Sequence, residues 1–301
     1  MKLKAIYEMW SWTCAVRFNV NEHISILDDK KTPFTVIENS KRFWTADPFL
    51  FEKDGVLYLF FEAFDIFKRK GLLGYRTLAK DGFGDIHIIF EYDSHLSFPF
   101  IYEDNGEIFI IPESAKSGEL FRLKCTSFPD QWIKERVLLN ENVVDTVRFK
   151  KDNTEYFISE TVDENHVYDR VDLYYTHGDA VISCDNNPVK RDVSNARGAG
   201  AVCEINGKLI RPSQDCGDSY GERLNLNEIT QLDKDGFSEE LLDTFTYKDI
   251  ALNKTITIDG IHTYNKLGSV EVIDLRIPGK FNLLYALGFF KKAFDKVFRR
   301  R

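Results

Sequence analysis

A short sequence unit recurs five times along this chain at a spacing of about fifty residues, and this repeat restricts the fold more than any other feature. Each clear copy is a hairpin pattern in which β-prone residues flank a Gly or Asn turn, and its second arm ends in Glu or Gln. Successive turn residues lie 51, 47, 54 and 53 positions apart: Gly55, Gly106, Asn153, Gly207 and Gly260. The last copy, at residues 258–263, is the weakest. A repeat of this length suits one four-stranded blade of a β-propeller.

The repeat therefore predicts an all-β fold, a five-bladed β-propeller followed by a C-terminal amphipathic helix. Strand-like runs at residues 71–76, 87–90 and 172–175 are expected to form outer strands, and the run from Trp10 to Phe18 is expected to complete the last blade. The alternative is a β-sandwich of unrelated hairpins, but a sandwich spaces its strands about 8 to 12 residues apart and has no reason to repeat a motif at about fifty. We expect the propeller in residues 1–277 and the helix in residues 278–301.

Charge is distributed unevenly along the chain. The formal net charge is −8, but residues 278–301 carry seven Lys or Arg and one Asp, which leaves −14 for the rest. An acidic body should repel nucleic acid, so no nucleic-acid partner is expected. The five cysteines include no C-x-x-C pair, and the six histidines show no H-x-H or H-E-x-x-H spacing. Neither a disulfide framework nor a metal site is therefore predicted.

Residues 279–301 have the pattern of a basic amphipathic helix. Apolar residues recur at spacings of three and four among Lys and Arg: Leu283, Leu284, Leu287, Phe290, Phe294 and Phe298. One interpretation is a helix that packs this stripe on the propeller. The aromatic residues and the Arg cluster favour the other, a helix that lies on anionic lipid. Since no signal segment or membrane span is recognisable, we expect a cytoplasmic protein bound peripherally to the inner face of the membrane.

Carboxylates occur at matching positions of the repeats. The innermost strand of each propeller blade lines the central channel, so residues that begin each repeat should converge. The candidate catalytic residues are Asp47, Glu113 and Asp145. Glycosidic chemistry needs one carboxylate as base or nucleophile and another that protonates the departing oxygen or tunes its neighbour. Taken singly, Asp47 would be a turn starter and Asp145 a strand-edge cap. Glu62 and Glu160, which end their hairpins, are either sugar-binding residues or simple surface charges.

A series of short segments extends this interpretation. They include Ala46-Asp-Pro-Phe-Leu-Phe-Glu52, His95-Leu-Ser-Phe-Pro-Phe100, Ile111-Pro-Glu-Ser114, Ala196-Arg-Gly-Ala-Gly200 and Arg211-Pro-Ser-Gln-Asp-Cys216. In this order the chain resembles the N-terminal domain of plant glucosamine inositolphosphorylceramide transferases and its stand-alone bacterial relatives. The resemblance implies a five-bladed propeller related to glycoside hydrolase families 43 and 32. It also implies that Asp47 acts as base or nucleophile and that Asp145 supports the transition state or tunes the acid.

The same resemblance adds two histidines to the predicted site. His262 matches a channel histidine of the related hydrolases, and His95 lies in one of the matching segments, so both are substrate-binding candidates. No cofactor is expected, although the resemblance leaves room for a structural divalent cation in the channel near His262.

The fourth repeat departs from the hydrolase pattern. It opens with Arg197, whereas those hydrolases are expected to carry an acid Glu on a later blade, and Arg211 and Asp215 follow. A phosphate leaving group needs positive charge, which arginine supplies in a bidentate manner, rather than a proton. Arg197 and Arg211 are therefore predicted to receive a donor phosphate, with Asp215 as a further substrate-binding residue. The alternative is that both arginines form internal salt bridges.

These observations predict a glycosyltransferase that extends a lipid-linked surface glycan. Its partners would be a nucleotide sugar or another phosphate-activated donor, a glycan or glycolipid acceptor, and an anionic membrane surface that binds residues 279–301. The alternatives are a glycoside hydrolase of the family 43 or 32 type and a non-catalytic glycan-binding propeller. The sequence specifies neither the sugar, the donor nucleotide and the linkage nor the oligomeric state.

Overall fold

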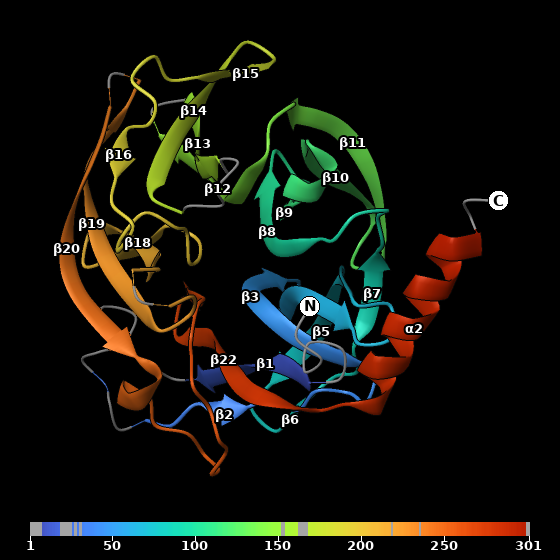
Figure 1. Cartoon of the computed structure of the whole chain (residues 1–301). Helices are drawn as coiled ribbons and strands as arrows, with labels where there is room; N and C mark the ends of the chain where they lie inside the picture. Colours follow the sequence, from blue (N-terminus) through green and yellow to red (C-terminus); the bar gives the residue numbers. More distant parts are fainter. Residues whose placement is uncertain are drawn as a thin grey trace.

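The computed structural model describes residues 8–18, 26, 29, 32–151, 154–161, 168–217, 219–234 and 236–298. Within them the strands form five antiparallel sheets arranged around a central axis (Figure 1). The predicted five-bladed β-propeller is therefore confirmed, and the sandwich alternative is excluded. A single C-terminal helix follows the last strand.

The first three blades follow the order of the chain from the inner strand outward. Blade 1 contains β3 (Phe43–Lys53), β4 (Val56–Asp65), β5 (Lys70–Ala79), β6 (Gly82–Phe83) and β7 (His87–Phe90). Blade 2 contains β8 (Ser97–Asp104), β9 (Glu107–Glu113), the short 3-10 helix η1 (Ala115–Ser117), β10 (Leu120–Ser127) and β11 (Gln131–Leu139). Blade 3 contains β12 (Val143–Lys151), β13 (Thr154–Thr161), β14 (Arg170–His177), β15 (Ala180–Ser183) and β16 (Lys190–Arg191).

Blade 4 follows the same order, whereas blade 5 combines strands from both ends of the chain. Blade 4 contains β17 (Cys203–Ile205), β18 (Lys208–Asp215), β19 (Arg223–Asp233) and β20 (Gly236–Thr246), followed by η2 (Tyr247–Asp249). Blade 5 contains β21 (Tyr264–Leu267), β22 (Val270–Phe281), β1 (Glu8–Phe18) and β2 (Thr35–Val36). The first and the last strand of the described chain therefore share one sheet.

Strand β1 closes the ring, as expected for the run from Trp10 to Phe18. It pairs with β22 over nearly its whole length, from Glu8 opposite Phe281 to Phe18 opposite Val270. Its central residues Cys14, Ala15 and Val16 are fully buried, so β1 contributes to the core as well as to the hydrogen-bonding of the sheet.

The hairpin turns explain why the repeat is visible in the sequence. Both residues of each clear turn have positive φ: Asp54 and Gly55, Asn105 and Gly106, Asn206 and Gly207. A type I′ turn requires this conformation at both central positions, which is why Asp, Asn and Gly recur there. The predicted turn residue Asn153 lies outside the described residues.

The fifth turn differs from the prediction. The hairpin of blade 5 joins β21 to β22 and turns at Gly268, which has φ 52°. Gly260 instead forms an isolated bridge with Arg276, and a Cβ atom there would lie 2.4 Å from the carbonyl oxygen of Gly221. A longer connection between blades 4 and 5 shifts the real turn, whereas Gly260 is required by close backbone packing.

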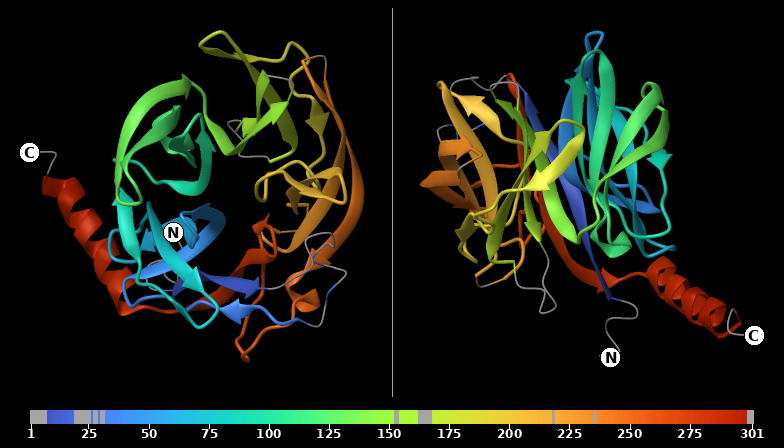
Figure 2. Two further views of the ribbon diagram at one scale, coloured as in Figure 1. Left: turned by 180° about the vertical axis from the view of Figure 1, so that it is seen from behind. Right: turned by 90° about the horizontal axis from the view of Figure 1, so that it is seen from above.

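Helix α2 (Leu283–Phe298) lies outside the ring, and its far end extends beyond the blades (Figure 2). Since β22 continues to Phe281, the helix begins a few residues after the expected boundary at 278. The core lies between the sheets, and its largest cluster joins apolar residues of blades 1 to 4. Among the described residues, no helix has both the length and the apolar composition needed to cross a bilayer.

Candidate functional site

The inner strands of the first three blades carry the same backbone irregularity. Asp47, Phe98 and Asp145 have φ of 50°, 46° and 50°, and at each of them the pairing with the next strand shifts register. Positive φ is uncommon for residues other than Gly, and β-bulges re-aim side chains. Because the same bulge occurs at one position of three repeats, it is a regular feature of these blades. It places Asp47 and Asp145 at equivalent positions of blades 1 and 3.

A second set of carboxylates lies opposite these bulges, at matching positions of the hairpins. Glu62 pairs with Ala46 and Glu113 with Ser97. Glu160 pairs with Val144 in the same way. All three side chains are buried or nearly so.

The three predicted catalytic residues lie within one electrostatic cluster. Burial raises the pKa of Glu113 to about 7, and the negative charges of Asp145 and Asp47 act in the same direction against Arg197. Burial likewise raises the pKa of Asp145, although Arg197 opposes this shift. The structure thus brings Asp47, Glu113 and Asp145 together, and their catalytic roles stay predictions.

Asp47 differs from its neighbours because it is held as an anion. Burial opposes its ionisation, but the hydrogen bond and charge of His262 and the backbone N–H of Phe98 outweigh it and lower the pKa of Asp47. The carboxylate oxygens lie 3.2 Å from Nε2 of His262, 3.1 Å from the N–H of Phe98 and 3.0 Å from Oγ1 of Thr263. An ionised carboxylate therefore lies in the same cluster as Glu113, whose pKa of about 7 leaves it partly protonated at neutral pH.

Asp274 supports this arrangement from β22, and sequence reasoning missed it. Its Oδ1 accepts hydrogen bonds from the backbone N–H groups of His262 and Thr263, and its Oδ2 accepts one from Asp47. Oδ1 also lies 2.8 Å from Nδ1 of His262. The available signal was an acidic residue inside the apolar run Val272-Ile-Asp-Leu275, since a buried charge requires partners.

His262 carries a positive charge between these two carboxylates. Burial disfavours that charge, but Asp274 and Asp47 outweigh burial and raise the pKa of His262 to about 10. The ring also packs on Trp12, with 3.8 Å between the ring centroids. His262 therefore lies beside Asp47, and its role in binding substrate stays a prediction. Trp12, which supports its ring, was not expected from the sequence.

The same three side chains are the candidate metal ligands among the described residues. One donor atom from each of Asp47, His262 and Asp274 lies within 4.8 Å of the others. A calcium ion takes about 6 to 8 oxygen ligands, whereas the carboxylate oxygens of both aspartates already accept hydrogen bonds. One imidazole nitrogen and two carboxylates that already accept hydrogen bonds offer fewer oxygen ligands than calcium takes, so this donor set by itself does not suit that ion.

Arg197 faces a cavity next to the carboxylates. Its Nε donates to Oδ2 of Asp145 at 2.7 Å, and its guanidinium carbon lies 4.2 and 4.8 Å from the ring centroids of Tyr168 and Tyr220. A cavity of about 390 Å³ is lined by these three residues and Cys216. The internal salt bridge that the sequence left open is therefore present, and Arg197 also lines a space large enough for a sugar ring.

Two buried polar groups near this cavity lack hydrogen-bond partners among the described residues. They are Oε2 of Glu160 and Oε1 of Gln214. Gln214 occupies the position of blade 4 that corresponds to Glu160 in blade 3. Burial raises the pKa of Glu160 to about 8, against the opposing charge of Arg197. A buried polar atom without a partner is costly, so both atoms are suited to contact a polar ligand. Sequence reasoning missed Gln214, although it stands at the same position of the repeat.

Glu62 and His95 form a pair beside the cluster. Nδ1 of His95 accepts a hydrogen bond from the N–H of Gly71, which leaves the proton of the neutral ring on Nε2, 3.2 Å from Oε1 of Glu62. Burial lowers the pKa of His95 to about 4, and burial together with the charge of Asp47 raises that of Glu62. Burial therefore disfavours the charged form of both side chains.

Arg211 and Asp215 serve the fold instead. Arg211 donates to both carboxylate oxygens of Glu239, at 2.7 and 2.6 Å, and to two backbone carbonyls at 3.0 Å each. The expectation that Arg211 receives a phosphate is thus corrected, because four of its five N–H groups are engaged inside blade 4. Asp215 accepts from the N–H of Gly217 and pairs with Arg223 at the end of β18.

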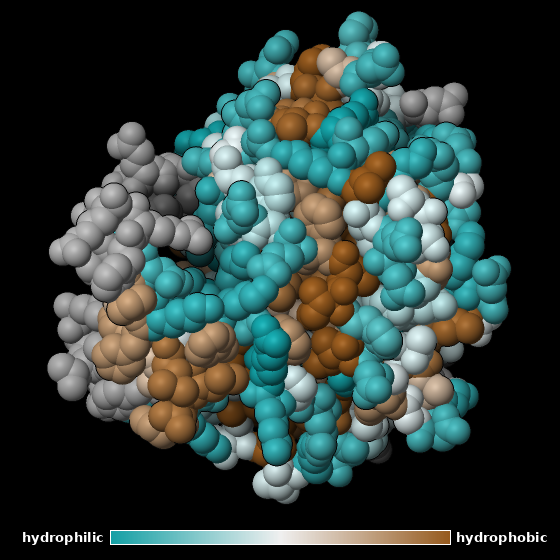
Figure 3. Space-filling model, turned by 90° about the vertical axis from the view of Figure 1, so that its right-hand side faces the viewer, coloured by the Kyte–Doolittle hydropathy of each residue, from teal (hydrophilic) through white to brown (hydrophobic). Residues whose placement is uncertain are grey.

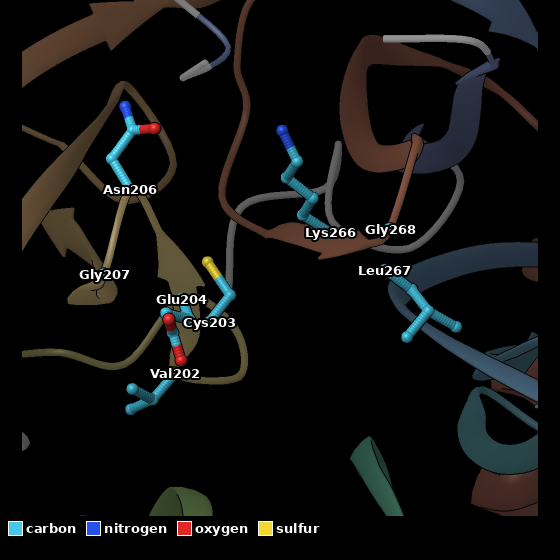
Figure 4. Close-up of a pocket in the computed structure, with 8 residues that line it drawn as sticks. All are labelled: Val202, Cys203, Glu204, Asn206, Gly207, Lys266, Leu267 and Gly268. Atoms are coloured by element: carbon cyan, nitrogen blue, oxygen red, sulfur yellow. The ribbon is translucent and has the colours of Figure 1, made fainter. Parts of the chain in front are cut away.

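A second cavity, of about 450 Å³, lies between the hairpin turns of blades 4 and 5 (Figure 4). Cys203, Asn206 and Lys266 are among the residues that line it. It contains none of the carboxylates described above, so it is separate from the cluster.

Fold and site together define a five-bladed propeller with a buried acid and base cluster next to a cavity. The same fold occurs in a family 62 α-L-arabinofuranosidase of Coprinopsis cinerea, with a TM-score of 0.57 and 11% identity over 90% of this chain and 98% of that chain. It also occurs in a family 117 glycoside hydrolase of Zobellia galactanivorans, with a TM-score of 0.53 and 11% identity over 93% and 92%. At such low identity these likenesses show the fold alone.

Residues 35–258 match the family described as glucosamine inositolphosphorylceramide transferase 1, N-terminal. The chain belongs to this family, which confirms the resemblance seen in the sequence. It is 30% identical over 203 residues to glucosamine inositolphosphorylceramide transferase 1 of Arabidopsis thaliana, covering 64% of this chain and 26% of the relative. It is 28% identical over 204 residues to that of Oryza sativa subsp. indica, covering 65% and 27%. The chain thus spans about a quarter of the length of these relatives.

Proposed function

We propose that this chain transfers a glycosyl group from a phosphate-linked donor to a glycan or glycolipid acceptor. The observation that carries the proposal is the separation of protonation states in one buried cluster, where Asp47 is an anion and Glu113 has a pKa of about 7. Groups whose environments push their pKa values apart are the usual acid and base of an active site.

Each group would then have a defined task. Asp47 accepts the proton of the acceptor hydroxyl as its oxygen forms the new bond to the sugar carbon. The bond from that carbon to the phosphate oxygen breaks, and the phosphate leaves as an anion toward Arg197 in the 390 Å³ cavity. Asp145 holds Arg197 in position through the 2.7 Å hydrogen bond. Glu113, while protonated, donates a hydrogen bond without adding negative charge.

The names of the relatives support transfer rather than hydrolysis. Both curated relatives are called glucosamine inositolphosphorylceramide transferases. Because the chain matches about a quarter of their length, this support concerns the class of reaction and leaves the sugar and the lipid open. We further propose that the protein works in the cytoplasm.

Hydrolysis of a glycosidic bond is the second candidate, and Glu113 is the observation that favours it. A glycosidase needs a protonated carboxyl group, and a group with a pKa of about 7 supplies one. The lack of an acid Glu on a later blade favours transfer, but Glu113 provides a proton donor from blade 2.

Thermal-shift screening against nucleotide sugars, nucleotides and free oligosaccharides tests the proposal. Transfer predicts that one nucleotide sugar and its nucleotide product raise the melting temperature and that Arg197→Ala abolishes both shifts. Arg211→Ala would be too destabilising as a control, so Lys208→Ala, at an exposed ion pair of blade 4, serves instead. A response to free oligosaccharides alone would contradict transfer.

A second assay separates the two reactions. A hydrolase predicts that Glu113→Gln loses cleavage of unactivated glycosides by about a hundredfold or more but retains cleavage of aryl glycosides, whose leaving groups need no proton. A transferase predicts no cleavage of either substrate by the wild-type protein. Binding without turnover of any substrate would indicate a glycan-binding propeller.

A further inference from the structure

Helix α2 carries apolar side chains on two opposite faces. On one face Leu284 and Tyr285 pack on the propeller, and Gly288 approaches it so closely that a Cβ atom would lie 2.1 Å from the carbonyl oxygen of Phe67. On the other face four residues spaced by four, three and four positions form an exposed stripe: Leu283, Leu287, Phe290 and Phe294. Of the stripe predicted from the sequence, Leu284 therefore packs on the propeller, whereas these four residues are exposed.

The exposed stripe is large for a surface in contact with water. Its four side chains are 49 to 62% exposed. Two further aromatic residues lie where β22 leads into α2, namely Phe281, which is 67% exposed, and Trp10, which is 64% exposed beside Gly279. Figure 3 faces the side of the molecule that carries α2 and shows apolar side chains gathered in patches there. Exposed apolar patches of this kind mark interaction sites.

The charges around the stripe select an anionic lipid surface as its occupant. Lys280, Lys291 and Lys296 are exposed on or next to α2, and residues 278–301 carry +6 against −14 for the remainder. Two copies of the helix packed stripe to stripe would bring like charges together, whereas anionic headgroups complement the basic residues. The helix has 16 residues, or roughly 24 Å at about 1.5 Å per residue, which suits a helix that lies in the interface rather than one that spans about 30 Å.

The helix docks next to the part of the propeller that holds the carboxylate cluster. Leu284 and Tyr285 pack in the same apolar cluster as Trp12, whose ring also packs on His262 with 3.8 Å between the ring centroids. After burial and the charge of Lys116, the charge of Lys292 on α2 contributes to the lowered pKa of His95. A surface bound by α2 therefore lies near the site.

We propose that the exposed stripe, with Trp10 and Phe281, rests on an anionic lipid surface. It thereby holds the part of the propeller that contains the Asp47 cluster at that surface. The statement about the acceptor rests on the proposed function: the acceptor is then a lipid-linked glycan whose headgroup projects from the same membrane. Lipid binding itself is independent of catalysis.

Co-sedimentation with vesicles tests the stripe. The full chain is expected to bind phosphatidylcholine vesicles that contain phosphatidylglycerol, and to bind more weakly at high salt or without the anionic lipid. Replacing Leu287, Phe290 and Phe294 with Ser should weaken binding by at least about a hundredfold, since each buried side chain of this size is worth about tenfold or more. The matched control, Leu241→Ser with Leu242→Ser on β20, removes equally exposed apolar side chains and should bind like the wild type. The proposal would be overturned if the stripe variant bound vesicles as well as the wild type does. It would also be overturned if the variant lost dimerisation rather than lipid binding.

Tryptophan fluorescence tests the placement. Of the four tryptophans, Trp10 is exposed and Trp12, Trp44 and Trp132 are buried, so brominated lipids should quench mainly Trp10. Trp10→Phe should remove most of that quenching while sedimentation persists. Vesicle binding without quenching would contradict the placement of the site at the surface. Soluble donors test the proposed function without lipid, so the two failures are distinguishable.

Discussion

At the scale of single residues, the site depends on His262 between Asp47 and Asp274. Each carboxylate stabilises the imidazolium, and the imidazolium keeps Asp47 ionised, so the three groups form one unit. Because Asp274 also accepts hydrogen bonds from backbone N–H groups of both His262 and Asp47, it joins the inner strand of blade 1 to β22 and to the segment that leads into β21.

His262 should make stability depend on pH. Its pKa rises from 6.5 to about 10 on folding, so the folded protein binds the proton more tightly than the unfolded chain. Its contribution to the free energy of unfolding is therefore complete below pH 6.5 and disappears as the pH rises through about 10. Urea denaturation of His262→Gln should show a loss of about 3 kcal/mol at low pH, the typical cost of an unpaired buried charge, and a smaller loss near pH 10. A loss that does not change with pH would contradict this.

Glu113 should set the alkaline limit of donor binding. Its pKa is about 7, so at higher pH it ionises and adds negative charge to a site that must admit an anionic phosphate. We predict that the Kd for the donor nucleotide, measured by calorimetry, rises about tenfold for each pH unit above about 7. Glu113→Gln, which cannot ionise, should remove this dependence, and an unchanged pH profile in the variant would exclude Glu113 as its source.

At the scale of elements, α2 is positioned by close contact at one glycine. Gly288→Val places side-chain atoms where the carbonyl oxygen of Phe67 lies, so the helix must shift away from blade 1. We predict faster hydrogen exchange in α2 and a destabilisation of about 1 to 3 kcal/mol. Ala293→Val, on an exposed position of the same helix, is the matched control and should leave exchange nearly unchanged. Equal exchange in both variants would show that Gly288 does not position α2.

The elements that could be predicted from the sequence are those whose signals are local. The hairpins were visible because turn chemistry is local, as at Asn105 and Gly106, and Asp47 and Asp145 were found because both occupy one position of the repeat. Asp274 was missed because its partner Asp47 is 227 residues away along the chain. Arg211 was misassigned because Glu239, which neutralises it, comes from a strand two positions further out in blade 4. Partners of this kind leave no local signal.

At the scale of the whole molecule, stability depends on ring closure by β1. Without it, β22 would expose its edge and the buried Val272, Ile273 and Leu275 would lose their cover. Deleting residues 1–18 should therefore abolish the cooperative thermal transition measured by circular dichroism. Deleting residues 282–301 should retain it, because α2 lies outside the ring. A cooperative transition in the first variant at the wild-type temperature would mean that the ring does not need β1.

Turnover by Asp47→Asn decides whether the cluster around Asp47 performs glycosyl chemistry. With the donor that stabilises the wild-type protein, the variant should bind within a few-fold of the wild type and lose turnover by about a hundredfold to ten-thousandfold, the usual contribution of a positioned base. Asp215→Asn, at a residue outside the cluster, should keep turnover. Wild-type turnover by Asp47→Asn would contradict the assignment of this cluster as the active site.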